Sequence, residues 1–234
     1  MSAIFKREFR SYFQSIIGFL FIGASLLFFG IFAFNYNLDK LSPSIAYVLA
    51  DMLPVVALLI PIVAVNSVLG EYKNGTYKLI YSLPLSSTQI FWGKYLALVS
   101  LVCIPTAVMA LLPFVLNFFG DISFISAFGS LFVFLLFEIA MLTIYFFISS
   151  IAKTTVISAV VSYSVAIVLY IINLLTALVK VEWIGDILSR ATMFGSFDNF
   201  IYGVFDIRAA IYYLSITAVF ALLSYRSINK RRFM

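Results

Sequence analysis

Long runs of apolar residues alternate with short polar segments along almost the whole sequence. A helix that crosses a lipid bilayer needs about 20 predominantly apolar residues. Six runs are long enough, and each predicts a membrane-spanning helix: Ile16–Phe34, Tyr47–Leu69, Tyr95–Phe119, Phe124–Ile151, Thr155–Val179 and Ala209–Ser224. We therefore expect an all-α integral membrane protein with six transmembrane helices, in which residues 1–234 form a single transmembrane domain.

The composition supports this fold and restricts the chemistry. Of the 234 residues, 64% are hydrophobic and 11% are charged, whereas a soluble domain carries about 25% charged residues. The chain has no histidine, so a residue widely used for acid–base catalysis and metal binding is missing. We find no set of catalytic residues and no set of metal ligands, and we do not expect an enzyme. We interpret the net charge of +5 as a consequence of membrane topology, and we expect no nucleic-acid partner.

Residues 1–15 show a different pattern, that of an amphipathic helix. One face of this helix would collect four aromatic residues: Phe5, Phe9, Tyr12 and Phe13. The cations lie on its other faces: Lys6, Arg7 and Arg10. Such a helix lies in the headgroup layer with its cations near anionic lipid. We predict an interfacial helix here, and a frayed tail before the first span is the alternative.

Basic residues are distributed unevenly between the two sides that six spans define. Eleven of the 15 Lys and Arg residues fall on the side of the two termini: Lys6, Arg7, Arg10, Lys73, Lys78, Lys94, Lys153, Arg226, Lys230, Arg231 and Arg232. The cytoplasmic side of membrane proteins carries such an excess of positive charge. We therefore expect a multi-pass protein of the cell membrane with both termini in the cytoplasm.

The segment between spans 2 and 3, residues 70–94, is the longest polar-rich stretch. Gly70 and Gly75 have the spacing of the glycines in a phosphate-binding loop. Thr76 and Tyr77, however, stand where that loop has Lys and then Ser or Thr, and without the Lys the phosphates lose their main cation. The segment therefore predicts that this chain does not bind ATP by itself.

Two short helices are predicted within this segment. The first begins at Thr76 and ends before Pro84, because the residue before a proline avoids helical angles. The second begins at Ser86, which forms a capping box with Gln89, and continues into span 3. Apolar and aromatic residues of the first helix are either a docking surface for another protein or an anchor in the lipid interface: Tyr77, Ile80, Tyr81 and Leu83.

The same segment resembles the cytoplasmic loop of permeases in the type-2 class of ABC exporters. Those carry a pattern close to E-x-K-x-G-T-x-x-x-L-x-x-x-P-[ILV]-S-x-x-x-I-x-x-G-K between spans 2 and 3. Ile80 stands where the pattern has Leu, and this chain matches the pattern at ten positions: Glu71, Lys73, Gly75, Thr76, Pro84, Leu85, Ser86, Ile90, Gly93 and Lys94. A second block is similar to the region before span 6 in the gliding-motility-type branch of this class: Phe194, Phe197, Gly203, Val204, Asp206, Ile207, Arg208, Tyr212, Tyr213, Leu214 and Ser215.

The resemblance implies that the short helix in residues 70–94 is a coupling helix, which sits in a groove of a separate ATP-hydrolysing subunit. The residues implied in this contact are Glu71, Lys73, Gly75, Thr76, Tyr77, Ile80, Leu83 and Pro84. The complex would contain two copies of the ATPase and a second permease, identical or related. ATP and Mg would be bound by the partner subunit, and this chain would hold no cofactor.

The resemblance also implies roles for the membrane segments. Spans 2 and 5 would line a central path, and residues 180–208 would form short helices that dip into the outer leaflet. A plain loop anchored by aromatic residues is the alternative for residues 180–208. Glu71 would pair with a cation of the N-terminal helix, with a solvated loop acid as the alternative; the candidate cations are Lys6, Arg7 and Arg10.

Two features inside the spans have more than one interpretation. Ser158, Ser162 and Ala166 form a line of small residues on span 5, which allows close helix packing either within the chain or between two permeases. Glu138 lies near the middle of span 4, where a charge is costly and should face protein or water. It is either part of a proton or substrate path or an acid hydrogen-bonded to a Tyr or Ser of a neighbouring span.

These observations favour a permease subunit of an ABC exporter, driven by a separate ATPase, that moves an amphipathic or hydrophobic substrate such as a peptide or an antibiotic. The alternative is a secondary transporter driven by an ion gradient, with Glu138 as the coupling acid. Such transporters contain paired broken helices in two similar halves, and the sequence shows no clear internal repeat. The third class is an intramembrane enzyme or a structural immunity protein. An intramembrane enzyme needs catalytic groups that converge on one site, and the sequence contains no such set.

Overall fold

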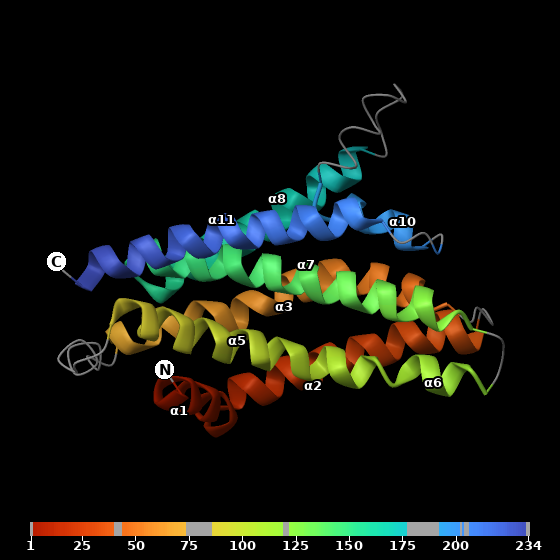
Figure 1. Cartoon of the computed structure of the whole chain (residues 1–234), viewed down its shortest axis with the longest axis horizontal. Helices are drawn as coiled ribbons and strands as arrows, with labels where there is room; N and C mark the ends of the chain where they lie inside the picture. Colours follow the sequence, from red (N-terminus) through yellow and green to blue (C-terminus); the bar gives the residue numbers. More distant parts are fainter. Residues whose placement is uncertain are drawn as a thin grey trace.

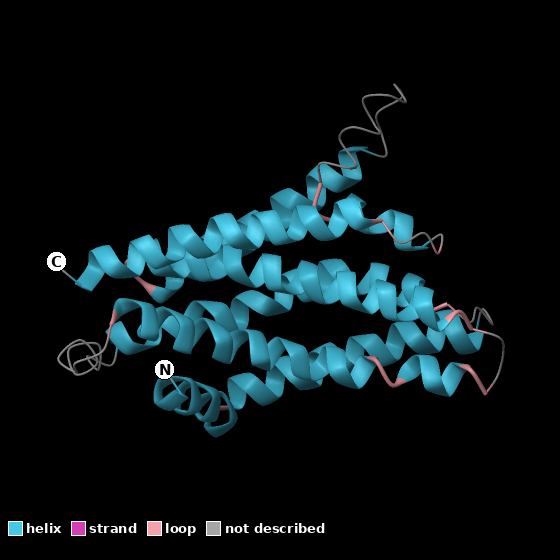
Figure 2. Cartoon of the chain, in the orientation of Figure 1, coloured by secondary structure: helices cyan, strands magenta, loops and turns pink. Residues whose placement is uncertain are grey.

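The structure is a computed structural model that describes residues 2–39, 44–73, 86–118, 122–176, 192–201, 203 and 206–232. Every regular element in these ranges is helical, and no strand occurs among them (Figure 1, Figure 2). In chain order the elements are α1 (Ser2–Gln14), α2 (Ile16–Ala33), η1 (Phe34–Asp39), α3 (Ile45–Lys73), α5 (Ser87–Met109), α6 (Leu112–Leu116), α7 (Phe124–Ile151), α8 (Thr155–Thr176), η2 (Gly195–Phe197), α10 (Asp198–Ile201) and α11 (Ile207–Arg232).

Six helical stretches of the described part are long and apolar enough to cross a membrane: Ile16–Asn37, Ile45–Ser67, Ser87–Leu116, Phe124–Ile151, Thr155–Thr176 and Ile207–Lys230. They confirm the all-α fold and the six predicted spans. The third begins at Ser87 instead of Tyr95, because Ser86 starts the helix within the polar segment. The sixth continues past Ser224 to Lys230, because the basic turns that follow the apolar run remain helical.

The third span is interrupted near its end, where the prolines of the sequence predict a kink. α5 ends at Met109, and the short helix α6 begins at Leu112 with Pro113 in its first turn. A proline has no N–H to donate to the carbonyl four residues earlier, and its ring clashes with that carbonyl. Pro113 therefore breaks the helix at this point.

Two helices, α3 and α7, form the centre of the bundle. They pack along each other, and most of their side chains are buried (Figure 1). α2 and α8 pack on α3, α11 packs on α7, and α5 contacts both α7 and α2. The outer helices α2, α8 and α11 leave most of their side chains exposed or only partly buried, as expected for helices whose outer faces meet lipid.

Prolines inside the central helix α3 are accommodated by its neighbour α7. Pro61 cannot donate a hydrogen bond to the carbonyl of Ala57, four residues earlier. The hydroxyl of Tyr145 in α7 donates to this carbonyl at 2.9 Å. Since an unsatisfied carbonyl in the hydrocarbon layer is costly, this bond replaces the missing one and joins α3 to α7.

Short helices between α8 and α11 cover one end of the bundle. η2 and α10 lie within the predicted segment 180–208, part of which is outside the described residues. Phe197 and Phe200 are buried there. Tyr213 of α11 donates a hydrogen bond to the carbonyl of Met193 at 2.6 Å. The described part of the segment is thus packed on protein.

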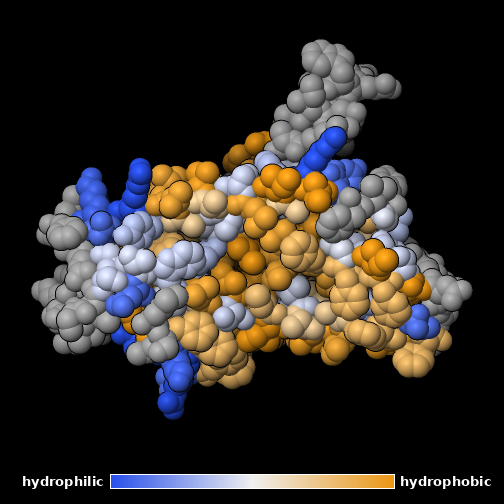
Figure 3. Space-filling model, in the orientation of Figure 1, coloured by the Kyte–Doolittle hydropathy of each residue, from blue (hydrophilic) through white to orange (hydrophobic). Residues whose placement is uncertain are grey.

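The two ends of the bundle differ in polarity. Helix α1 and the last turns of α11 lie at one end, called here the terminal end, and α6 and α10 lie at the opposite end (Figure 1). Figure 3 shows an apolar band around the middle of the bundle and a group of hydrophilic residues at the terminal end. The elements at this end carry four exposed cations: Lys6 and Arg10 in α1, Lys153 between α7 and α8, and Arg226 in the last turns of α11.

Candidate functional site: the junction of α1, α3 and α5

Most residues of the predicted coupling segment lie outside the described residues: Gly75, Thr76, Tyr77, Ile80, Leu83 and Pro84. Glu71 and Lys73 lie in the last turn of α3, and their side chains are outside the described part as well. The structure does describe the two helices that lead into and out of this segment. α3 ends at Lys73, and α5 begins at Ser87, both at the terminal end (Figure 1). The candidate site is therefore the junction that these two helices form with α1.

The start of α5 is held by the predicted capping box. The hydroxyl oxygen of Ser86 accepts a hydrogen bond from the backbone N–H of Gln89 at 3.2 Å. The backbone N–H of Ser86 donates in return to the side-chain oxygen of Gln89 at 3.2 Å. Two backbone donors that the helix start leaves unpaired are thereby satisfied. The segment before Ser86 therefore leads directly into a well-formed helix.

Lys94, two turns into α5, joins three helices. Its side chain is buried, and the whole residue is only 3% exposed. The ammonium group donates to the backbone carbonyl of Ser67 in α3 at 3.0 Å. It also lies 3.4 Å from a carboxylate oxygen of Glu8 in α1. A single buried cation therefore connects the end of α3 and the start of α5 to α1.

Glu8 is the buried acid that balances this cation. Burial by itself raises the pKa of Glu8, but Lys94 and Arg7 together outweigh it and leave the pKa below its ordinary value. Arg7 also donates a hydrogen bond to the same carboxylate oxygen that faces Lys94. Because Glu8 is ionised at neutral pH, the contact between α1 and α5 is a buried ion pair with a second cation beside it.

Gly93 allows α1 to approach α5 closely enough for this ion pair to form. A Cβ atom at position 93 would lie 2.7 Å from Cγ2 and 2.9 Å from Cβ of Ile4, which is closer than real side chains pack. Ile4 and Glu8 are one helical turn apart on α1, and both face α5. The Gly-Lys pair at the end of the sequence pattern thus has a physical explanation: Gly93 provides the space and Lys94 provides the charge.

The rest of α1 packs its apolar face on the bundle. The rings of Phe5 and Phe9 stack at 5.7 Å, and those of Phe9 and Phe13 lie 5.0 Å apart. Tyr12 is buried, whereas Lys6 and Arg10 are exposed. The helix predicted for residues 1–15 is therefore present. Its aromatic face contacts protein, and its place at the membrane interface stays a prediction.

Sequence reasoning did not identify Glu8. It proposed instead that Lys6, Arg7 or Arg10 pairs with Glu71, whose side chain is outside the described part. The signal was present, because Glu8 is the first acid of the chain, the next is Asp39, and cations surround it. A single acid within a cationic amphipathic helix indicates a basic partner on another helix.

Glu138 of α7 lies outside this junction, within the membrane-spanning part. Its side chain is fully buried, and the hydroxyl of Thr106 in α5 donates to Oε2 at 2.6 Å. Within the described ranges, Oε1 has no hydrogen-bond partner. The hydrogen-bonded interpretation predicted Tyr or Ser as the partner, and the partner is a Thr. Glu138 thus contacts α5 at Thr106, about three turns beyond Lys94 of the junction.

The predicted line of small residues on span 5 faces the inside of the chain. Ser158, Ser162 and Ala166 of α8 are all buried, and α8 packs mainly on α3. Among the described residues, neither serine hydroxyl has a hydrogen-bond partner. A cavity of about 190 Å³ continues the same contact beside Ala166 and Tyr170. These small residues are thus covered within one chain.

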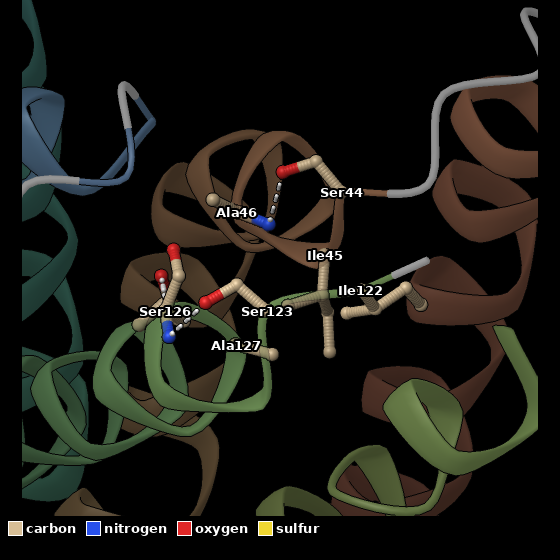
Figure 4. A pocket seen from close by; sticks show the side chains of 8 residues that line it. Ser44, Ile45, Ala46, Ile122, Ser123, Ser126 and Ala127 are labelled. Atoms are coloured by element: carbon tan, nitrogen blue, oxygen red, sulfur yellow. Dashed lines mark hydrogen bonds between the residues drawn. The ribbon is translucent and has the colours of Figure 1, made fainter. Parts of the chain in front are cut away.

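A small polar pocket lies at the opposite end, between the first turns of α3 and α7 (Figure 4). Its volume is about 160 Å³, and four serines line it: Ser44, Ser123, Ser126 and Ser130. The hydroxyls of Ser44 and Ser123 accept hydrogen bonds from backbone N–H groups of their own helices, at 3.3 and 3.5 Å. Among the described residues, no acidic or basic side chain lines it.

Comparison with known families gives one match. The family described as "ABC-2 family transporter protein" matches residues 3–231, which is nearly the whole chain. Among curated proteins, no relative was found.

Proposed function

Because the chain belongs to the ABC-2 family of transporter proteins, we propose that it is the permease subunit of an exporter driven by ATP hydrolysis in a separate partner subunit. Membership of this family and the six apolar helices make it a multi-pass membrane component of an ABC-type transporter. In the proposed complex, this chain works with two copies of the ATPase, which bind ATP and Mg, and with a second permease, identical or related. The proposed substrate is amphipathic or hydrophobic, such as a peptide or an antibiotic.

The observation that carries this proposal is the position of Lys94. The segment proposed to contact the ATPase lies within residues 70–94, and residues 74–85 of it connect α3 to α5. Lys94 holds the end of α3, the start of α5 and helix α1 together just beyond that segment. A displacement of the segment by the partner would therefore move three helices as one unit. Removing one member of a buried ion pair typically costs about 3–5 kcal/mol, so this junction resists separation.

The distribution of charge supports the proposed orientation in the cell membrane. The exposed cations Lys6, Arg10, Lys153 and Arg226 lie at the terminal end, and the cytoplasmic side of membrane proteins is enriched in Lys and Arg. The terminal end, with both termini and the coupling segment, is therefore proposed to face the cytoplasm. An ATPase that uses cytoplasmic ATP would meet the chain on this side.

The proposed path runs along the contact between α3 and α8. The hydroxyls of Ser158 and Ser162 are buried in this contact without a hydrogen-bond partner among the described residues. A cavity of about 190 Å³ lies further along, beside Pro54, Ala57 and Ala166. The buried hydroxyls and the cavity are the features of this contact that support its assignment to the path.

The experiment that tests the function is co-purification followed by ATP turnover. The chain, produced with the genes that neighbour its own, should retain an ATPase through detergent extraction. Replacing Tyr77 and Leu83 by Ala should release that ATPase and reduce ATP turnover at least tenfold. Replacing Phe118 by Ala is the matched control, because Phe118 is exposed at the opposite end.

The result that would overturn the proposal is transport that needs no ATPase. If the purified chain alone moves substrate under an ion gradient, and Glu138→Gln abolishes this flux, the secondary transporter is the correct function. If the double substitution in the coupling segment leaves ATPase binding unchanged, the partner does not bind where we propose.

A further inference from the structure

An apolar groove opens on the side of the bundle at the terminal end, between α5 and α11. Its volume is about 520 Å³, within the range of about 300–1,000 Å³ for small-molecule sites. Phe91 and Trp92 of α5 line it together with Ala218, Ala221 and Tyr225 of α11. None of these residues belongs to the junction described above.

The groove exists because small and large residues alternate along its length. Ala218 and Ala221, one turn apart on α11, leave space beside the aromatic rings. The rings of Phe91 and Tyr225 are 5.9 Å apart. The hydroxyls of Thr88 and Tyr225 share a hydrogen bond of 3.3 Å across the end of the groove nearest the helix termini. These hydroxyls therefore satisfy each other, and the remaining lining is apolar.

Among the described residues of α5 and α11, the charges beside the groove are of one sign. Neither α5 nor α11 contains an acidic residue. The last turns of α11 carry the exposed cations Arg226, next to Tyr225 in sequence, and Lys230. Lys94 does not contribute, because it is paired with Glu8. A ligand that suits this site has an apolar tail and an anionic head.

We propose that the groove binds an anionic phospholipid from the leaflet at the terminal end, with one acyl chain between α5 and α11 and the phosphate beside Arg226 and Lys230. Basic sites at the ends of transmembrane helices bind anionic headgroups in this way. The groove is accessible to lipid, because Trp92 and Leu222 are 40% and 65% exposed. This binding is independent of the partner ATPase and goes beyond the proposed transport function.

The chain contains a reporter for this site. It has two tryptophans, so Trp183→Phe leaves Trp92, in the groove wall, as the sole tryptophan. The Trp183→Phe chain is reconstituted into bilayers in which a fixed fraction of the lipid is brominated phosphatidylglycerol or brominated phosphatidylcholine. Bromine quenches tryptophan fluorescence on contact. We expect Trp92 to be quenched by both lipids, with an about fivefold preference for phosphatidylglycerol, since one cation near the surface attracts anionic lipid by about this factor.

Two pairs of variants separate headgroup from chain binding. Replacing both Arg226 and Lys230 by Gln should abolish the preference for phosphatidylglycerol, whereas Lys153→Gln, at another exposed cation of the same end, should leave it unchanged. Ala221→Leu should fill the groove and reduce quenching by both lipids at least twofold. Ala107→Leu, at an exposed position further along α5, should not.

Three results would each overturn the proposal. Equal quenching by the two lipids in the Trp183→Phe chain would show that the groove does not select anionic lipid. A preference that survives the substitution of both Arg226 and Lys230 by Gln would show that the headgroup lies elsewhere. The absence of quenching would show that another protein surface, such as a second copy of the chain, covers Trp92. None of these results bears on whether an ATPase drives transport.

Discussion

Glu8 and Glu138 are two buried carboxylates with opposite surroundings. Glu8, at the terminal end, lies beside the cations Lys94 and Arg7. Glu138, in the middle of α7, receives one hydrogen bond from the hydroxyl of Thr106, and the described residues include no ion pair to it. Each carboxylate contacts a residue of α5: Glu8 contacts Lys94, and Glu138 contacts Thr106. Both acids are buried.

The difference shows how this chain divides its polar contacts. At the terminal end of the bundle, an ion pair between helices is possible because a cation is close and the headgroup region lowers the cost of charge. Inside the span, an unpaired charge is costly, and a neutral side chain is the form that this environment favours. The junction is therefore held by charge, whereas the centre of the bundle is held by packing and neutral hydrogen bonds.

The largest expected effect comes from removing the cation of the junction. Lys94→Met leaves the carboxylate of Glu8 buried without its main partner, so we expect a loss of about 3–5 kcal/mol. Thermal unfolding of the purified chain in detergent measures this loss. The double variant Glu8→Gln with Lys94→Met should recover most of it, because no buried charge then remains unpaired. A double variant as unstable as Lys94→Met alone would contradict the ion pair.

A smaller effect is expected at the close contact between α1 and α5. Gly93→Ala places a Cβ atom 2.7 Å from Ile4, and such overpacking costs about 1–3 kcal/mol. Gly23 in α2 is the matched control, because a Cβ atom there meets nothing within 4 Å, so Gly23→Ala should be neutral or stabilising by about 0.5–1 kcal/mol. Thermal unfolding of both variants checks this. Equal stabilities would show that α1 does not pack closely on α5.

The smallest effect is a dependence on acid that should distinguish the two carboxylates. The pKa of Glu8 is lowered from 4.5 in the folded chain. Its contribution to stability is therefore complete above about pH 4.5 and is lost as the pH falls through the lower folded-state pKa. Thermal unfolding between pH 3 and pH 6 should show this loss, and Glu8→Gln should remove it. Glu138→Gln should preserve it, since that site does not depend on a charge. If Glu138→Gln removes this loss and Glu8→Gln preserves it, the charge that stabilises the fold is on Glu138 and not on Glu8.

The positions of most helices of this chain could be predicted from the sequence. The six apolar runs identified the spans, and Ser86 with Gln89 identified the start of α5, because periodicity and capping depend on neighbours in sequence. The partner of Glu138 was predicted only by class, as a hydroxyl, because Thr106 lies 32 positions away in sequence. Glu8 was missed because its partner Lys94 lies 86 positions away.

The sequence by itself determined the number of spans, the distribution of charge between the two ends and the absence of a phosphate-binding Lys, since each depends on residue types and their local order. The tertiary structure decided which polar groups meet: Lys94 with Ser67 and Glu8, Tyr145 with the carbonyl that Pro61 leaves unpaired, and Thr106 with Glu138. In a bilayer almost every helix face is apolar, so hydrophobicity does not specify which faces pack together. The few buried polar groups do, because each is costly until a neighbouring helix satisfies it.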